Sequence, residues 1–147
     1  MTVSQISVFA QSKPGHMVRV LDLFEGAGVS VRGFSAADTG EYGILRFVVD
    51  KPQEALAALK EAGCACVETP VICLKLDDVP GELSRVMGVL AKCDINVLYS
   101  YSMISTYIVL STTDPERARE LLAAEPVEMI SQDDIARIVA ERAAKEA

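Results

Sequence analysis

The sequence predicts an α+β protein made of two tandem βαββαβ units, each with an antiparallel sheet, followed by a short C-terminal helix. Two observations predict this fold class. The dipeptide Pro14-Gly15 recurs as Pro80-Gly81, at an offset of 80 − 14 = 66 residues. The same offset aligns two apolar stripes with the i, i+3, i+4, i+7 spacing of a buried helix face. The stripes are Met17, Val20, Leu21 and Phe24 in the first copy, and Leu83, Val86, Met87 and Leu90 in the second.

The duplication divides the 147 residues into two domains and a tail. We expect the first domain over residues 1–69, the second over 70–131 and the C-terminal helix over 132–147. A unit of about 70 residues has a modest core, so two copies should pack on each other and on a second chain. The sequence therefore predicts a homodimer.

The first copy begins with an apolar strand over residues 3–10. Pro14 has φ preset for a helix start and Gly15 lets the backbone approach a neighbour, so a helix follows to Glu25. Apolar runs and turn residues then predict the remaining elements. These are strands over residues 29–37, 42–50 and 64–68, with a helix that opens at Pro52 and ends at Gly63.

The second copy repeats this order after Thr69-Pro70, which is too short to let the units move independently. At the second helix the offset falls to 115 − 52 = 63, so the first copy has the longer hairpin flap, over residues 38–43. The predicted strands cover residues 71–75, 95–103, 106–111 and 127–130, and the helices cover 81–92 and a segment from Pro115. Residues 131–134 resemble a capping box and open the C-terminal helix.

Charge and hydropathy exclude two classes of partner. The formal net charge is −7 and no cluster of Lys or Arg is present, which argues against nucleic acid. No apolar run is long enough to span a membrane, and the N-terminus has no leader pattern. We expect a cytoplasmic protein that binds neither nucleic acid nor membrane.

Residues that could carry chemistry are few. Cys64, Cys66, Cys73 and Cys93 lie in apolar segments without a CxxC pair, so buried reduced thiols are expected, with Cys64 and Cys66 on one strand face as a weak metal or redox alternative. His16 is the only histidine, so no metal site is expected. No nucleophile stands beside a base, and no carboxylate pair is set by spacing. The sequence predicts a protein without a cofactor that is not an enzyme.

The βαββαβ order is the ferredoxin-like plan, which supports many unrelated functions. The motif is narrower: a strand, Asp78-Val79-Pro80-Gly81, an apolar-faced helix, and then Asp94-Ile95-Asn96-Val97. The chain resembles a stand-alone tandem ACT protein over about residues 3–131. ACT domains are small regulatory modules that bind amino acids.

The resemblance implies a ligand site where the loop between the first strand and first helix meets the start of the second strand. In the second copy it comprises Asp78, Val79, Pro80, Gly81, Glu82, Leu83, Asn96 and Val97. Free helix amides can receive a carboxylate, Asp78 can pair with an α-ammonium group, and Asn96 offers a donor and an acceptor. Asp78 could instead cap the helix, and Asn96 could serve only its turn.

The first copy departs from this pattern. Ser12 replaces Asp78 and Ser30 replaces Asn96, so the ammonium partner is lost. A weaker second site remains, with Ser12, Lys13, Gly15, His16 and Ser30. This copy either binds differently, with Lys13 or His16 contributing, or is only a wall of the other site. Lone exposed His and Lys residues are usually solvated.

Three functional hypotheses follow. The first is a non-catalytic sensor that binds a free amino acid and regulates amino-acid metabolism through an enzyme partner. The second is a regulatory or structural subunit of an enzyme complex that has no ligand of its own. Catalysis is the third and the least supported, because the chain lacks the groups for it.

Overall fold

The computed structural model describes residues 2–103 and 107–146. The chain forms two compact units. The first unit comprises Ser4–Thr69 with Asp133–Ala147, and the second comprises Met1–Val3 with Pro70–Gln132. Strand β4 (Ala65–Lys75) runs from one unit into the other. Thr69 and Pro70, expected as a linker, therefore lie inside a strand.

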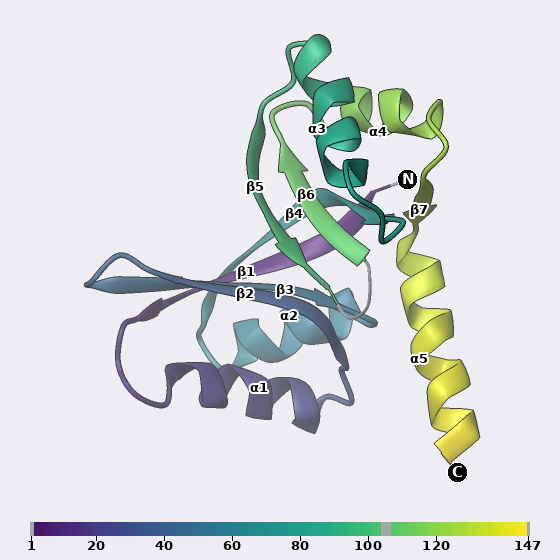
Figure 1. Ribbon diagram of the computed structural model, residues 1–147. Helices are drawn as coiled ribbons and strands as arrows, with labels where there is room; N and C mark the ends of the chain where they lie inside the picture. Colours follow the sequence, from purple (N-terminus) through teal and green to yellow (C-terminus); the bar gives the residue numbers. More distant parts are fainter. Residues whose placement is uncertain (1, 104–106, 147) are drawn as a thin grey trace. The chain divides into compact units, whose positions relative to one another are not determined.

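The first unit contains β1 (Val3–Gln11), α1 (His16–Gly26), β2 (Val31–Asp38), β3 (Tyr42–Val49), α2 (Pro52–Glu61) and the beginning of β4. Its strands follow the order β2-β3-β1-β4, and β3 is antiparallel to both β1 and β2. Helices α1 and α2 cover one face of this sheet (Figure 1). This is the predicted βαββαβ arrangement.

The apolar stripe of α1 fills the core of the first unit as its spacing predicted. Val20 and Phe24 are buried, and the rings of Phe24 and Phe47 meet edge to face with centroids 5.0 Å apart. Ile6 and Val8 of β1 are buried beneath them. Alternation in the strands and the helical period in α1 thus direct one set of side chains inward.

The second unit repeats the plan with α3 (Glu82–Lys92), β5 (Val97–Ser102), β6 (Tyr107–Thr112), α4 (Pro115–Ala123) and β7 (Glu128–Ile130). Strand β4 pairs antiparallel with β6 and β7, and β5 pairs with β6. Val86 and Leu90 of the predicted stripe are fully buried in its core and Met87 packs against it, whereas Leu83, predicted on the same face, is exposed. Thr106, expected to begin a strand, lies outside the described residues.

Helix α5 (Gln132–Glu146) follows β7 and has 15 residues. It spans the residues predicted for the C-terminal helix and is the longest helix in the described part of the chain. No helix within those described residues is both long and apolar enough to cross a bilayer.

The two Pro-Gly loops have the same backbone. Gly15 has φ 87° and ψ −8°, Gly81 has φ 88° and ψ −9°, and each is the residue before its helix. A Cβ added at either glycine would meet no atom within 4 Å. No group of the protein therefore approaches these glycines closely, and the expected close approach of a ligand stays a prediction. The left-handed φ by itself favours glycine here, because side chains with a Cβ are strained there.

Candidate functional site

The loop before α3 forms the rim of a cavity of about 250 Å³ in the second unit. Asp78, Val79, Glu82 and Leu83 line it, as do Asp77 and side chains of β5 and β6. The other lining residues are Leu76, Ser102, Tyr107 and Ile108. Pro80 and Gly81 shape the loop without lining the cavity. The wall combines exposed carboxylates with aliphatic side chains and hydroxyl groups.

One carboxylate of this cavity is already paired. Glu82 accepts two hydrogen bonds from Arg85, from Nη2 to Oε1 at 2.7 Å and from Nε to Oε2 at 3.1 Å. These bonds, together with the guanidinium charge, hold the pKa of Glu82 below its usual range. Arg85 also donates from Nη1 to Glu125 Oε2 at 3.1 Å. Asp77 and Asp78 are therefore the carboxylates that remain for a ligand.

Asn96 and Val97 do not line this cavity. The backbone N–H of Asn96 donates to Thr113 Oγ1 at 3.2 Å, and its carbonyl accepts from the N–H of Thr113 at 3.0 Å. Val97 pairs with Thr112 at the start of β5. The backbone of Asn96 thus stabilises the turn, which is the alternative to ligand binding that the sequence left open. Its side chain is exposed to solvent.

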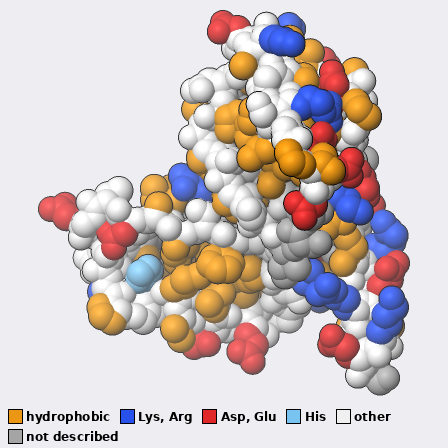
Figure 2. Space-filling model, viewed as in Figure 1, with side chains coloured by type: hydrophobic (Ala, Val, Ile, Leu, Met, Phe, Trp, Pro, Cys, Tyr) orange, Lys and Arg blue, Asp and Glu red, His pale blue; other side chains and the backbone are white. Residues whose placement is uncertain are grey.

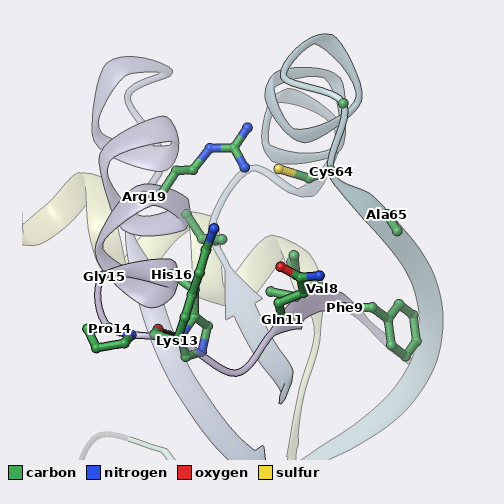
Figure 3. A pocket seen from close by; sticks show the side chains of 13 residues that line it. Val8, Phe9, Gln11, Lys13, Pro14, Gly15, His16, Arg19, Cys64 and Ala65 are labelled. Atoms are coloured by element: carbon green, nitrogen blue, oxygen red, sulfur yellow. Dashed lines mark hydrogen bonds between the residues drawn. The ribbon is translucent and has the colours of Figure 1, made fainter. Parts of the chain in front are cut away.

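The equivalent loop of the first unit borders a larger cavity of about 440 Å³ (Figure 3). Lys13, Gly15 and His16 line it, as the sequence proposed for the weaker site. The end of β1 and the beginning of β4 supply much of the rest of the wall. Among the described residues that line it there is no Asp or Glu. The remaining lining residues are Val8, Phe9, Ala10, Gln11, Pro14, Arg19, Val20, Gly63, Cys64 and Ala65.

Ser12 and Ser30 do not line the first-unit cavity. The Ser12 hydroxyl donates to Asp38 in the hairpin flap, and this bond, followed by one from the N–H of Gly40, lowers the pKa of Asp38. The N–H of Ser30 donates to Asp50 Oδ1 at 2.7 Å. Both serines therefore form hydrogen bonds to aspartates of their own unit and lie outside the cavity wall.

His16 has a defined orientation. Its Nδ1 lies 2.6 Å from the carbonyl oxygen of Lys13, a distance that assigns the proton to Nδ1. The only histidine of the sequence is visible at the surface in Figure 2, in pale blue. No three His, Cys, Asp or Glu side chains in the described part of the chain lie close enough together to hold a metal ion.

Arg19 is a charged cavity residue that sequence reasoning missed, as is Asp77 in the second unit. Arg19 extends from α1 toward the segment that carries Cys64 (Figure 3), and its Nη2 donates to the carbonyl oxygen of Ala62 at 3.1 Å. The repeat offset contained the signal, because 85 − 66 = 19 aligns Arg19 with Arg85.

The four cysteines are free thiols with different exposure. Only Cys73 is buried, and burial raises the pKa of its thiol to about 12. Cys64 and Cys66 pack against the edge of the first core and Cys93 is half-buried. The expectation of buried thiols is therefore correct for Cys73 alone.

The family model that describes an ACT domain pair matches residues 1–139 of this chain. No curated protein sequence matches the chain significantly. Among solved structures, a protein from Bacteroides thetaiotaomicron is similar at 26% identity and a TM-score of 0.87. The match covers 92% of this chain and 96% of that one.

Two regulatory subunits of aspartate kinase have the same fold. The subunit from Thermus thermophilus is 20% identical, with a TM-score of 0.62 over 84% of this chain and 91% of that one. The subunit from Thermus flavus is 19% identical, with a TM-score of 0.61 over 84% and 90%.

Proposed function

The chain belongs to the ACT domain pair family, and from this premise we propose that it is a non-catalytic sensor that binds a free amino acid and regulates amino-acid metabolism. One observation carries the proposal. Each unit has a cavity beside a Pro-Gly loop of the same backbone geometry. A duplicated cavity at a duplicated loop is what a pair of ligand-binding modules requires.

In the second unit we propose that Asp78 binds the α-ammonium group. Its carboxylate is exposed at the cavity rim, and no described group forms an ion pair with it at this loop. Val79, Leu83 and Ile108 provide an apolar surface for the ligand side chain. The amides of the first turn of α3 provide donors for the carboxylate.

Asn96 and Val97 are not direct contacts of the site proposed here. They lie at the start of β5, apart from the cavity wall, and the Asn96 amide is exposed. Of β5 it is Ser102, at the opposite end, that lines the cavity, so about 17 Å of extended strand separates Val97 from the wall. We therefore propose a smaller effect for Asn96→Ala than for Asp78→Ala.

The proposal of a non-catalytic role is supported by the groups present. Neither cavity contains a nucleophile hydrogen-bonded to a base among the described residues, and His16 is bonded to a backbone carbonyl. The fold neighbours include regulatory subunits of aspartate kinase. By analogy with them we propose that an enzyme is the regulated partner, and that the protein is a cytoplasmic homodimer.

A thermal-shift screen of the purified protein against the twenty amino acids tests the sensor proposal. A ligand at about a hundred times its dissociation constant adds about 2.7 kcal/mol of stability. For domains of this size that is a shift of several degrees. We expect a shift with one or two amino acids that is lost in Asp78→Ala and kept in Asp133→Ala, an exposed acid on α5. If Asp78→Ala keeps the full shift, the site assignment fails.

A subunit without a ligand of its own is the second candidate. Strands β2 and β5 are sheet edges that carry exposed apolar side chains, Phe34 with 55% and Leu98 with 57% of its surface accessible. Apolar side chains are visible on the surface of both units in Figure 2. Exposed apolar edges favour protein partners. Recovery of a stoichiometric enzyme by affinity purification, with no dependence on any amino acid, would support this candidate.

A further inference from the structure

We propose that the first-unit cavity is an anion site that binds the carboxylate of a small molecule with an apolar chain, with Arg19 as its main ligand. This inference rests on the proposed function, since it assigns a chemical class of ligand to one of the two cavities. It also assigns different ligands to the two cavities, because the charged residues that line the second cavity have the opposite sign.

Arg19 and Arg85 occupy equivalent positions in the two units but have different partners. Arg85 in the second unit is neutralised by Glu82 and Glu125. The repeat offsets of 66 and 63 place His16 and Ala62 at the positions of these two carboxylates. Arg19 has therefore lost both acidic partners.

The guanidinium of Arg19 is exposed and forms no ion pair with the described residues. Its one bond to described residues is the donation to the Ala62 carbonyl at 3.1 Å, which leaves other N–H donors of the group available. A guanidinium can bind a carboxylate through two parallel N–H groups, as it can a phosphate.

The rest of the wall favours the same ligand class. Lys13 adds a second positive charge at the loop, and Pro14, Cys64 and Ala65, which are exposed or half-buried, add apolar surface. Gln11 can donate or accept a hydrogen bond. Because no described lining residue is acidic, an α-ammonium group would find no carboxylate here. A carboxylate is favoured, and a free ammonium group is not.

The second-unit cavity supplies the contrast. Asp77 and Asp78 line it, and the arginine of its helix is occupied by internal ion pairs. A ligand that has a carboxylate and no ammonium group would meet the negative charges of Asp77 and Asp78 in that cavity. The change from Glu82 to His16 in the first copy thus favours a ligand without an ammonium group in the first cavity.

An NMR titration of the full ¹⁵N-labelled chain tests the inference. The probes are acetate, isovalerate and phenylacetate, which share the carboxylate and differ in apolar size, with isovaleramide as the uncharged match for isovalerate. We expect saturable amide shifts at Gly15, His16 and Gly63 with at least one carboxylate. We expect isovaleramide to bind at least about tenfold more weakly than isovalerate, because it lacks the charge-assisted hydrogen bonds.

Two variants test the role of Arg19. Arg19→Gln should weaken binding of the carboxylate at least about tenfold. His16→Glu should do the same by rebuilding the ion pair of the second unit. The substitution should not unfold α1. The first turn of this helix has no acidic residue, and a negative charge is stabilising at a helix N-terminus. Arg117→Gln, a change at an exposed arginine on α4, is the control and should bind like the wild type.

The inference is overturned if none of the three carboxylates shifts these amides, or if Arg19→Gln binds as the wild type does. If an amino acid still binds at the Asp78 loop in that case, the proposed sensor function stands and only the assignment of the first cavity fails. If neither cavity responds to any carboxylate or amino acid, both proposals fail.

Discussion

Glu82 and Arg85 lie one turn apart on α3 and are joined by two hydrogen bonds. The first cause of the lowered pKa of Glu82 is this bonding to Arg85, and the arginine charge adds to it. A lowered pKa in the folded state means that the ionised carboxylate favours folding. The contribution is present above the unfolded pKa of about 4.5 and disappears as the pH falls through the lower folded value.

We therefore expect the difference in unfolding free energy between the wild type and Glu82→Gln to depend on pH. The wild type should be the more stable protein at pH 7, and the difference should shrink as the pH falls below 4.5. Urea unfolding at several pH values measures it. A difference that stays constant down to pH 2 would contradict the ion pair.

The contribution of Cys73 to stability should be lost at high pH, whereas that of Glu82 is lost at low pH. Burial raises the pKa of Cys73 from 9.0 to about 12, so the neutral thiol favours folding. Its contribution is complete below pH 9.0 and is lost as the pH rises toward 12. We expect Cys73→Val to lose less stability than the wild type between these values, as measured by chemical unfolding. Equal losses in the two proteins would show that the thiol titrates without linkage to folding.

Two residues show what sequence reasoning can reach at this scale. The local motif predicted Asp78, which lines a cavity, and its role in binding stays a prediction. Arg19 was missed because its role depends on a change in its neighbours, from Glu82 and Glu125 to His16 and Ala62. One of these neighbours lies on another helix, so only the fold brings the group together. Asn96 was joined to Asp78 on resemblance, and the cavity wall does not include it.

At the scale of elements, helix α3 offers a matched test of the loop geometry. Gly81 has φ 88° and Gly88 lies in the helix interior, and neither would meet an atom within 4 Å on gaining a Cβ. Gly81→Ala should cost about 1 kcal/mol because of backbone strain alone. Gly88→Ala should stabilise by about 0.5–1 kcal/mol through helix propensity.

Thermal and urea unfolding of both variants measure these effects. The opposite signs are the essential result, since the two substitutions are the same in chemistry and lie in or beside one helix. A stabilising Gly81→Ala would show that this loop does not require the left-handed conformation.

The helices and most of the strands could be predicted because the apolar spacing and the turn residues agree in both copies. The continuity of β4 could not be predicted, because Thr69-Pro70 stands between the two strands predicted over residues 64–68 and 71–75 and is typical of a break. Proline lacks a backbone donor and usually ends a strand, but it is tolerated where no ladder bond is required. Pro70 is exposed and lies between the pairing segments of the two units.

At the scale of the whole molecule, we expect a homodimer. Each core is small, and edge strands β2 and β5 leave Phe34 and Leu98 exposed. Light scattering should give about twice the 15.8 kDa of one chain. A mass of 15.8 kDa at micromolar concentration would mean that the two units are sufficient by themselves.

Whether the molecule is a sensor depends on one property, the binding of a free amino acid. Calorimetric titration of the full chain with each of the twenty amino acids tests this most directly. The account predicts saturable binding of at least one of them, weakened at least about tenfold by Asp78→Ala through loss of a charge-assisted bond. Absence of saturable binding with all twenty would contradict the account and leave the subunit without a ligand as the better description.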